Sequence, residues 1–327
     1  MRFDVISFGS AIVDVFIKSP DIQVEKSTKV YTGKALIVPY GAKCEVEKLV
    51  VCSGGGGTNT AVGFSRLGLK AAVVARCGWD FAGKLIRQEI KKEGVDDTLL
   101  AQVEGEKTDY STILIGPDGG RTIFVYRGGT RLERSVIDFK KLNSSWFYVS
   151  SLEGNIALLT DLVNHAKKKQ IKIAVNPGRR ELEQKEKLLD LAKKFDVLTV
   201  NREEAAKLLG LTIADETIFS KICLVLPKVI VVVTDGDRGA HVCVPKKGRL
   251  VTEGLKVTKA DSTGAGDGFG CGLIAGLIEG WDLEKALKLG VCNGASAVTR
   301  IGAKPGLIRK KEVDSWLEKP LKIRWEE

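Results

Sequence analysis

Short, continuously apolar segments alternate along the chain with segments of helical periodicity, and this alternation limits the available folds more than any other feature. Six segments are rich in β-branched and aromatic residues: 4–8, 71–77, 145–150, 171–176, 196–201 and 229–234. Helix candidates lie between several of them, at 80–93, 156–169 and 202–209. Strands without polar alternation are typical of parallel sheets that helices cover. The pattern predicts an α/β, doubly wound, mostly parallel sheet with helices on both faces.

Two stretches interrupt the alternation and predict a small antiparallel β lid. Residues 30–51 and 108–126 each contain paired strand-like segments with no helix between them. Turn residues lie inside them, at 39–41 and 117–120. A flap beside the crevice of the main sheet can cover a ligand and exclude water, as a reaction sensitive to hydrolysis requires.

Length and composition agree with one large core and a small appendage. The chain has 327 residues, of which 44% are hydrophobic and 28% charged, as in ordinary globular proteins. Its longest apolar runs are far shorter than the roughly 20 residues that cross a bilayer, and the N-terminus has no signal-peptide pattern. We therefore expect one domain over residues 1–327 with lid segments at approximately 14–52 and 106–130, a cytoplasmic location and no membrane partner.

Cysteine, histidine and lysine usage narrows the chemistry. The seven cysteines are scattered without a CxxC pair, so their spacing suggests neither a disulfide framework nor a zinc site, and a reducing cytoplasm fits. With only His165 and His241, a histidine-rich metal centre is excluded and a Ser-His-Asp triad is disfavoured. The net charge of +10 comes with lysine clusters that lack interleaved aromatic residues. Such clusters indicate a solvated surface, so we expect no nucleic-acid partner.

The segment DSTGAGDGFG, residues 261–270, has the parts of an anion site. Gly264, Ala265 and Gly266 are small enough for backbone N–H groups to converge, and the apolar residues that follow at helical spacing predict a helix N-terminus. Asp267 lies in that first turn, where it can accept a proton from an attacking hydroxyl. The same residues also fit a plain helix cap with close helix packing, and the segment alone does not decide between the two.

Two common phosphate motifs are absent. The segment GWDFAGKL, residues 78–85, resembles a P-loop, but Leu85 has no hydroxyl for a magnesium ion. It is interpreted as a strand-end glycine followed by a helix. The dinucleotide pattern GxGxxG also fails in residues 264–270, where the third glycine is out of place.

Together with GGGGTNTA at residues 54–61, DSTGAGDGFG resembles the two signatures of the ribokinase (PfkB carbohydrate kinase) family. The signatures occur in the order and at the separation of that family, and the resemblance extends from about residue 4 to about 315. Further similar segments lie at residues 9–14, 78–84, 201–204, 234–240 and 298–306.

The resemblance implies transfer of the γ-phosphoryl group of ATP to a hydroxyl, usually the primary alcohol of a sugar or nucleoside. Asp267 matches the general base of the family, and the backbone of Gly264, Ala265 and Gly266 matches its anion hole. This agrees with the physical interpretation, because the attacking oxygen needs deprotonation and the migrating charge needs fixed donors.

Acceptor-binding positions are also implied by the resemblance: Asp14, Gly54, Gly55, Gly56, Gly57, Asn59 and Glu153. Ribokinases proper carry lysine where this chain has Gly56, so ribose is not identified as the acceptor. Arg127 follows the second lid segment; if it enters the site, an acidic or phosphorylated sugar fits, because a guanidinium pairs with such groups bidentately.

On the donor side the resemblance implies nucleotide contacts by Asn201, Thr234, Gly236 and Gly239, with Gly264 and Gly266. Glu204 matches the carboxylate that holds Mg²⁺ through water. A monovalent-cation site, for K⁺, is implied at Asp261, Thr263, Ala297, Arg300, Gly302 and Gly306. Asp235 stands where the family more often has an apolar residue.

Alternatives remain open at this point. A nucleoside kinase of the same family needs an apolar or aromatic slot near Asp14, and the aromatic residues of the lid segments do not decide the matter: Phe16, Tyr31, Tyr40, Tyr110 and Tyr126. A non-catalytic sugar or nucleotide sensor would be favoured by a broken base or anion hole, but Asp267 and both flanking glycines are present. An exposed lid edge is compatible with a homodimer.

Overall fold

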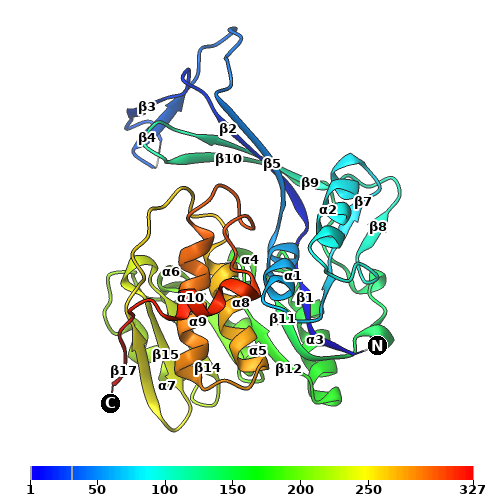
Figure 1. The fold of residues 1–327 in the computed structure, drawn as a ribbon, viewed down its shortest axis with the longest axis vertical. Helices are drawn as coiled ribbons and strands as arrows, with labels where there is room; N and C mark the ends of the chain where they lie inside the picture. Colours follow the sequence, from blue (N-terminus) through cyan, green and yellow to red (C-terminus); the bar gives the residue numbers. More distant parts are fainter. Residues whose placement is uncertain (1, 31, 327) are drawn as a thin grey trace.

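A nine-stranded sheet forms the centre of the protein in the computed structural model, which describes residues 2–30 and 32–326 (Figure 1). Its strands are, in spatial order, β6 (Ala71–Val74), β1 (Phe3–Phe8), β11 (Ser144–Val149), β12 (Lys172–Val175), β13 (Val197–Asn201), β14 (Ile230–Thr234), β15 (Ala240–Val244), β16 (Gly248–Thr252) and β17 (Ile323–Glu326). Strands β6 to β14 pair in parallel, and β15 to β17 add an antiparallel edge. The predicted doubly wound, mostly parallel sheet is confirmed.

Helices cover both faces of this sheet. They are α1 (Gly56–Arg66), α2 (Phe81–Lys92), α3 (Ile156–Lys169), α4 (Arg179–Leu182), α5 (Lys185–Ala192), α6 (Arg202–Leu209), α7 (Ile218–Val225), α8 (Ala265–Ile278), α9 (Leu283–Ala297) and α10 (Val313–Leu317). The helices predicted at 80–93, 156–169 and 202–209 are confirmed as α2, α3 and α6. Asp80 caps α2 by accepting a hydrogen bond from the Gly83 N–H at 2.8 Å, so residues 78–85 have the structural role that the sequence predicts.

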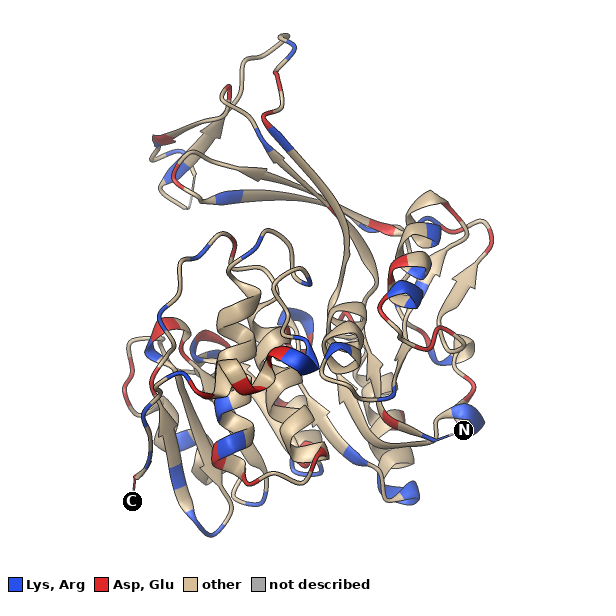
Figure 2. Ribbon diagram, viewed as in Figure 1, with Lys and Arg blue, Asp and Glu red and all other residues tan. Residues whose placement is uncertain are grey.

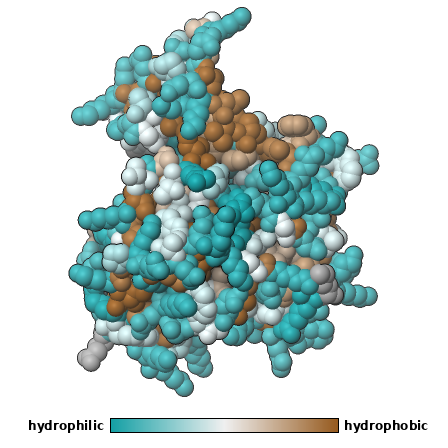
Figure 3. Space-filling model, viewed as in Figure 1, coloured by the Kyte–Doolittle hydropathy of each residue, from teal (hydrophilic) through white to brown (hydrophobic). Residues whose placement is uncertain are grey.

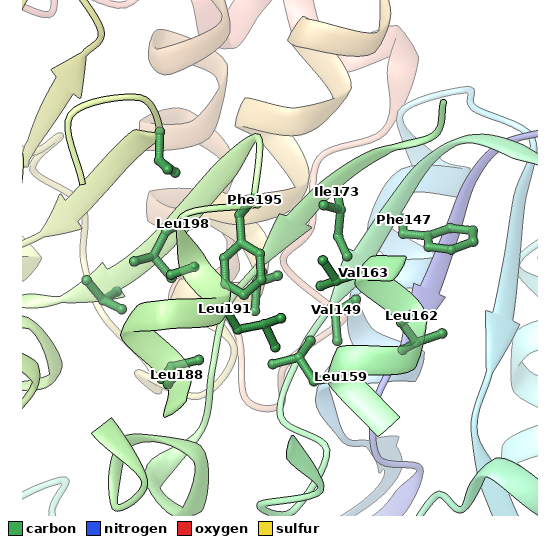
Figure 4. Close-up of a cluster of buried hydrophobic side chains, with 14 of the residues drawn as sticks. Phe147, Val149, Leu159, Leu162, Val163, Ile173, Leu188, Leu191, Phe195 and Leu198 are labelled. Atoms are coloured by element: carbon green, nitrogen blue, oxygen red, sulfur yellow. The ribbon is translucent and has the colours of Figure 1, made fainter. Parts of the chain in front are cut away.

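Two hydrophobic cores lie on opposite faces of the sheet because neighbouring strand residues point in opposite directions. Phe147 of β11 packs in one core with Leu162 of α3 and Leu191 of α5 (Figure 4). The next residue, Tyr148, packs in the other core with Phe269 of α8. The continuously apolar strands of the sequence are thus explained by burial on both sides.

A second, four-stranded sheet projects from this body and is called the lid here (Figure 1). Its strand order is β10 (Arg121–Tyr126), β9 (Asp109–Ile115), β2 (Ile12–Lys18) and β5 (Lys48–Gly54). The β9–β10 hairpin confirms the predicted turn at 117–120. The pairs β9–β10 and β2–β5 are antiparallel, whereas β2 and β9 run in parallel.

The pairing predicted within residues 30–51 is wrong. Strand β4 (Lys34–Ile37) pairs with β3 (Gln23–Lys26), and β5 pairs with β2, so residues 39–41 form a turn in a loop rather than the end of a hairpin. The hairpin turn lies instead between β3 and β4, where Gly33 has a φ of 70° that favours glycine. The local turn signal at 39–41 gave no information about which strands pair.

A disulfide bond joins Cys223 of α7 to Cys243 of β15, with the two Cα atoms 5.4 Å apart. The expectation that the cysteines form no disulfide is therefore wrong for this pair. Packing of α7 against the antiparallel edge brings together two cysteines that lie 20 residues apart without a recognisable motif. In the described part of the chain no helix is long and apolar enough to span a membrane.

Lys and Arg positions are interspersed with Asp and Glu positions along the ribbon of the body in Figure 2. This distribution agrees with the sequence interpretation of the lysine clusters as solvated surface. The loop between β16 and α8 rises from the body toward the outer part of the lid (Figure 1). The candidate site lies where three parts of the molecule meet: the carboxyl ends of the parallel strands, the start of α8, and the ends of the lid strands nearest the body.

Candidate active site

The starts of α1 and α8 meet in a side-chain hydrogen bond between Asn59 and Asp267. Asn59 Nδ2 donates to Asp267 Oδ2 at 2.8 Å, which joins two residues 208 positions apart. Asn59 is only 4% exposed, and its other polar atom, Oδ1, has no hydrogen-bond partner. A buried amide oxygen without a partner costs free energy, so Asn59 Oδ1 is a candidate to accept a hydrogen bond from a ligand.

Burial of the Asp267 carboxyl raises its pKa to about 6, and the hydrogen bond from Asn59 and the charge of Lys304 act in the opposite direction. The residue lies in the first turn of α8, where unpaired backbone N–H groups and the helix dipole favour negative charge. Gly264, the residue before the helix, has a φ of 78°, and a Cβ there would lie 2.6 Å from the Cβ of Ala303. A carboxyl group with a raised pKa and a turn whose N–H groups can bind an anion therefore occupy the same helix end.

The glycine loop at residues 54–57 packs against the acceptor-side residues without space for side chains. A Cβ at Gly54 would lie 2.0 Å from Asp14 Oδ2, and one at Gly56 would lie 2.6 Å from the Cβ of Ser150 and 3.8 Å from Asp267 Oδ1. Gly55 has a φ of 92° at the start of α1. The loop thus brings Asp14, Ser150 and Asp267 around one small space.

Asp14 contributes a second carboxylate from strand β2 and is 8% exposed. Burial raises its pKa; a hydrogen bond with Ser111 and the charge of Lys304 lower it, and the charge of Asp261 raises it again. Its carboxylate therefore has a neighbouring donor in Ser111, and among the described residues it forms no ion pair. It can accept hydrogen bonds from a pair of ligand hydroxyls.

Glu153 lies on the other side of this region and is held by two arginines. Its carboxylate pairs with Arg127 Nη1 and Arg180 Nη1, each at 3.1 Å, and Arg127 also pairs with Asp109 at 3.1 Å. Glu153 has a φ of 57°, a conformation that is uncommon outside glycine and is often found at functional sites. These residues line one pocket with Gly9, Ser10 and Arg131.

A separate groove lies against the start of α8. Thr234, Gly236, Gly239 and Gly266, four of the positions expected to contact a nucleotide, line it together. Its remaining lining is largely apolar and includes Leu255, Val257, Phe269, Val291 and Val298. An apolar slot beside an anion-binding turn suits a nucleobase and its phosphates.

Asn201 and Glu204 cap helix α6. Asn201 Oδ1 accepts from the Glu204 N–H, and Glu204 Oε2 accepts from the Asn201 N–H, both at 2.8 Å. This capping box leaves Oε1 of Glu204 available, and burial raises the pKa of this carboxyl. The neighbouring Asp235 pairs with Arg202 at 3.2 Å and Arg238 at 2.8 Å, which explains a carboxylate where an apolar residue was expected.

Two loops expected to hold a monovalent cation lie side by side. Asp261 Oδ1 accepts from the Thr263 N–H at 3.0 Å, and Oδ2 accepts from the Gly302 N–H at 3.0 Å. A Cβ at Gly306 would lie 2.3 Å from the carbonyl oxygen of Ser296 and 2.6 Å from that of Ala297. Convergence of carbonyl oxygens on a position without a side chain fits a cation site, whereas Arg300 is exposed at its edge.

Several residues of this region were missed by the sequence analysis or given no role there. Ser150 is 5% exposed and its Oγ has no partner, and Lys304 is 2% exposed with Nζ donating to the Ser53 carbonyl at 2.8 Å. Arg180 and Arg121 contact the region from α4 and the lid. Lys304 lies in the segment 298–306 that resembles the family, but the resemblance gave it no role. Ser150 follows an apolar strand, which is a weak signal for a site, and Arg121 and Arg180 lie in no motif.

Comparison with known proteins gives concordant similarities. The family model described as pfkB family carbohydrate kinase matches residues 3–310. The chain is 30% identical over 324 residues to a ribokinase of Haemophilus influenzae, covering 97% of this chain and 99% of the relative. It is 29% identical to a fructokinase of Escherichia coli over 82% of this chain and 92% of that protein.

Solved structures agree on the fold. A ribokinase of Arabidopsis thaliana complexed with ribose and ATP superposes with a TM-score of 0.81 at 20% identity, covering 98% of this chain and 100% of that one. A nucleoside kinase of Methanocaldococcus jannaschii gives a TM-score of 0.77 at 21% identity, with 97% and 99% covered. At such identities these structures are similar in fold, and they include kinases of both sugars and nucleosides.

Proposed function

Because this chain belongs to the pfkB family of carbohydrate kinases, which are phosphotransferases acting on an alcohol group, we propose that it transfers the γ-phosphoryl group of ATP to a hydroxyl of a sugar or sugar derivative. We expect the acceptor hydroxyl to be a primary alcohol. The reaction takes place in the cytoplasm, beneath lid segments at approximately 14–52 and 106–130 of a single domain.

The hydrogen bond between Asn59 and Asp267 carries this proposal. It joins the first turns of α1, which follows the glycine loop, to the helix end that can bind an anion, so one carboxylate lies between the proposed acceptor and phosphate sites. The unpartnered atoms Asn59 Oδ1 and Ser150 Oγ lie beside it and can accept hydrogen bonds from acceptor hydroxyls. A site that buries such groups discriminates against an acceptor without the matching hydroxyls.

In the proposed mechanism Asp267 accepts the proton of the attacking hydroxyl while Asp14 and Asn59 orient the acceptor. The backbone N–H groups of residues 264–267 donate hydrogen bonds to the transferred phosphoryl group and stabilise its negative charge. General-base catalysis is worth about 10² to 10⁴ in rate, and donors fixed in place contribute a comparable amount. Proton removal and charge stabilisation thus come from one helix turn.

The cations in the proposal are assigned to residues that fit them. Glu204 has a free carboxylate oxygen that can hold Mg²⁺ through water, and the carbonyls near Gly306 with Asp261 suit K⁺. Bound with ATP, Mg²⁺ would offset the charge of the phosphates. Asn201, Thr234, Gly236 and Gly239 would contact the nucleotide.

The kind of acceptor, a neutral sugar, an acidic or phosphorylated sugar, or a nucleoside, distinguishes a sugar kinase from the alternative functions. Glu153, Arg127 and Arg180 form an acceptor-side ion cluster, which suits either a neutral sugar or one with an acidic or phosphate group. For a nucleoside acceptor the lid aromatics offer little: Phe16 is buried, Tyr40 is fully exposed, and Tyr31 lies outside the described residues. Because Asp267 and its turn are intact, a sugar or nucleotide sensor without catalysis is the less favoured function.

The test is ADP release from ATP and Mg²⁺ with ribose, fructose, 2-keto-3-deoxygluconate, fructose 6-phosphate, adenosine and cytidine, each with and without K⁺. We expect turnover of at least one sugar and strong loss in Asp267→Asn. Asp190→Asn, at an exposed carboxylate paired with Lys193, is the matched control. No turnover of any acceptor contradicts the kinase proposal, and equal turnover by Asp267→Asn contradicts the assignment of the base.

The lid also offers a surface for a homodimer. Large apolar side chains are exposed on its two edge strands, β5 and β10, and Figure 3 shows apolar residues gathered there. They are Leu49, Val51, Ile123, Phe124, Val125 and Tyr126. Exposed edges with apolar residues favour association, so we propose that two copies pair through their lids.

A further inference from the structure

Lid strand β10 is tied to the body near both of its ends by arginines. Just past its end, Arg127 pairs with Glu153 on the acceptor side at 3.1 Å. At its beginning, Arg121 Nη1 pairs with Asp261 Oδ1 in the loop that precedes α8. The two arginines are six positions apart in extended chain, a span of about 20 Å. The strand therefore crosses from the acceptor pocket to the anion-binding turn.

Asp261 is the point where three segments meet. Its side chain is 5% exposed, and it accepts hydrogen bonds from Thr263 in its own loop and from the Gly302 N–H. Gly264, which begins the anion-binding turn, follows Thr263 directly. Any change in the position of Asp261 is therefore transmitted to the turn through two residues of backbone.

The negative charge of Asp261 is unfavourable for binding phosphate groups in the proposed reaction. A nearly buried carboxylate beside an anion-binding turn repels the phosphate groups that must enter there, and it also raises the pKa of Asp14. Arg121 is the lid's counter-charge for this carboxylate. In an opened lid Asp261 would keep its hydrogen bonds from Thr263 and Gly302 but lose the guanidinium of Arg121.

We propose that Arg121 is a positioning residue that couples lid closure to the anion-binding turn. Its ion pair with Asp261 holds the outer lid over the reacting groups, neutralises the carboxylate next to the turn and keeps water out during transfer. The inference rests on the proposed function, because it assigns Arg121 a part in the same transfer. Since Arg121 lies on an exposed lid strand, its substitution leaves both hydrophobic cores intact.

The chain offers a matched control within the lid. Lys34 of β4 pairs with Asp118 of the β9–β10 turn at 2.9 Å, with both side chains exposed. This ion pair has a similar chemical form, and its carboxylate Asp118 lies three residues from Arg121 in sequence, but it joins one part of the lid to another. Substitution of Lys34 removes a lid charge without affecting a contact to the body.

The first measurement compares phosphoryl transfer with loss of ATP to water in wild type, Arg121→Gln, Arg121→Lys and Lys34→Gln. For Arg121→Gln we expect kcat/KM for the acceptor to fall about tenfold, the size expected for a half-buried charged hydrogen bond. The ratio of ADP formed to acceptor phosphorylated should rise in this variant. Arg121→Lys should recover part of both effects, and Lys34→Gln should match wild type. An unchanged ratio in Arg121→Gln overturns the proposal, even if the overall rate falls.

The second measurement needs no turnover. Hydrogen–deuterium exchange of the ligand-free protein should be faster in Arg121→Gln at residues 121–126 and 261–264, and unchanged in Lys34→Gln. If wild type phosphorylates no acceptor, the kinase proposal fails, and exchange alone then tests the lid contact. If Arg121→Gln exchanges like wild type in both segments, the contact does not hold the lid and the inference is wrong.

Discussion

Asp267 combines two properties that its sequence neighbours alone do not explain. Its carboxyl lies at a helix N-terminus, which favours negative charge, but burial raises its pKa to about 6. Near pH 6 the carboxyl of Asp267 is therefore about half protonated, and above that pH it is mostly ionised and able to accept a proton. Such a pKa suits proton transfer, because a base is most effective when its pKa is near the working pH.

The pH dependence of turnover follows from this value. As the proposed base Asp267 acts only when ionised, so kcat/KM, which reports the free enzyme, should fall as the pH drops through about 6 and reach a plateau above it. A pH–rate profile between pH 4.5 and 8.5 measures this limb, by about tenfold per pH unit on its acidic side. A plateau that continues down to pH 4.5 would mean that another group takes the proton.

Gly56 is restricted by its contact with Ser150, where a Cβ would lie 2.6 Å from the Cβ of serine. Gly56→Ala should therefore displace the loop next to Asp267 and lower kcat/KM about tenfold or more. Ser150→Gly removes the clash but also the Ser150 hydroxyl, so the double variant is compared with Ser150→Gly: in that background Gly56→Ala should lower kcat/KM less than it does in wild type. Steady-state kinetics with the best acceptor provides the comparison. Full activity of Gly56→Ala would show that the loop yields without consequence.

Residue-level prediction reached furthest where the signal is local. The small residues and Asp267 at the start of α8 allowed an anion site to be proposed, because anion binding at a helix start requires those residue types in sequence, and the role of Asp267 stays a prediction. Arg121, Arg180 and Lys304 could not, because their partners Asp261, Glu153 and Ser53 lie far along the chain. Without knowledge of its partner, a long basic side chain is interpreted as part of the solvated surface.

At the scale of elements, the disulfide between α7 and β15 makes a covalent link near the antiparallel edge of the sheet. Its two cysteines are 20 residues apart, and closing a loop of this length removes entropy from the unfolded chain. The double variant Cys223→Ser/Cys243→Ser should lower the free energy of unfolding by about 2 to 4 kcal/mol.

Denaturant unfolding of the oxidised protein, with and without reductant, measures this contribution. Cys44→Ser is the matched control, because Cys44 is exposed and free. Reduction should bring wild type to the stability of the double variant and leave the double variant unchanged. Equal stability of all four samples would show that the bond adds nothing to the folded state.

Elements with strong internal periodicity were predicted from the sequence, and those defined by distant partners were not. The apolar strands and the helices α2, α3 and α6 carry their own pattern. The lid strand β2 pairs with β5 and β9, and neither partner follows it directly in sequence. Strand pairing depends on packing and closure of the whole lid, so a turn signal at 39–41 pointed to the wrong partner.

At the scale of the whole molecule, the exposed lid edges predict self-association. Phe124 is 60% exposed on β10 and Leu49 is 60% exposed on β5, so a dimer through these strands would bury both. Phe124→Glu should weaken the dimer at least tenfold by placing a charge in an apolar interface. Sedimentation velocity over a range of concentrations gives the dissociation constant.

Ile213→Glu is the control for this prediction, since Ile213 is 53% exposed on the body rather than the lid. The control should associate like wild type. A wild type that stays monomeric throughout, or a Phe124→Glu variant that dimerises as strongly as wild type, would contradict pairing through the lid.

The distance in sequence between Asn59 and Asp267 has a consequence for the newly made chain. The two residues are 208 positions apart, so at synthesis rates of about 5 to 20 residues per second the acceptor loop is synthesised about 10 to 40 s before the proposed base. During that interval the nascent chain can hold no complete site. A truncated product that ends before α8 is therefore unable to spend ATP, whatever acceptor it meets.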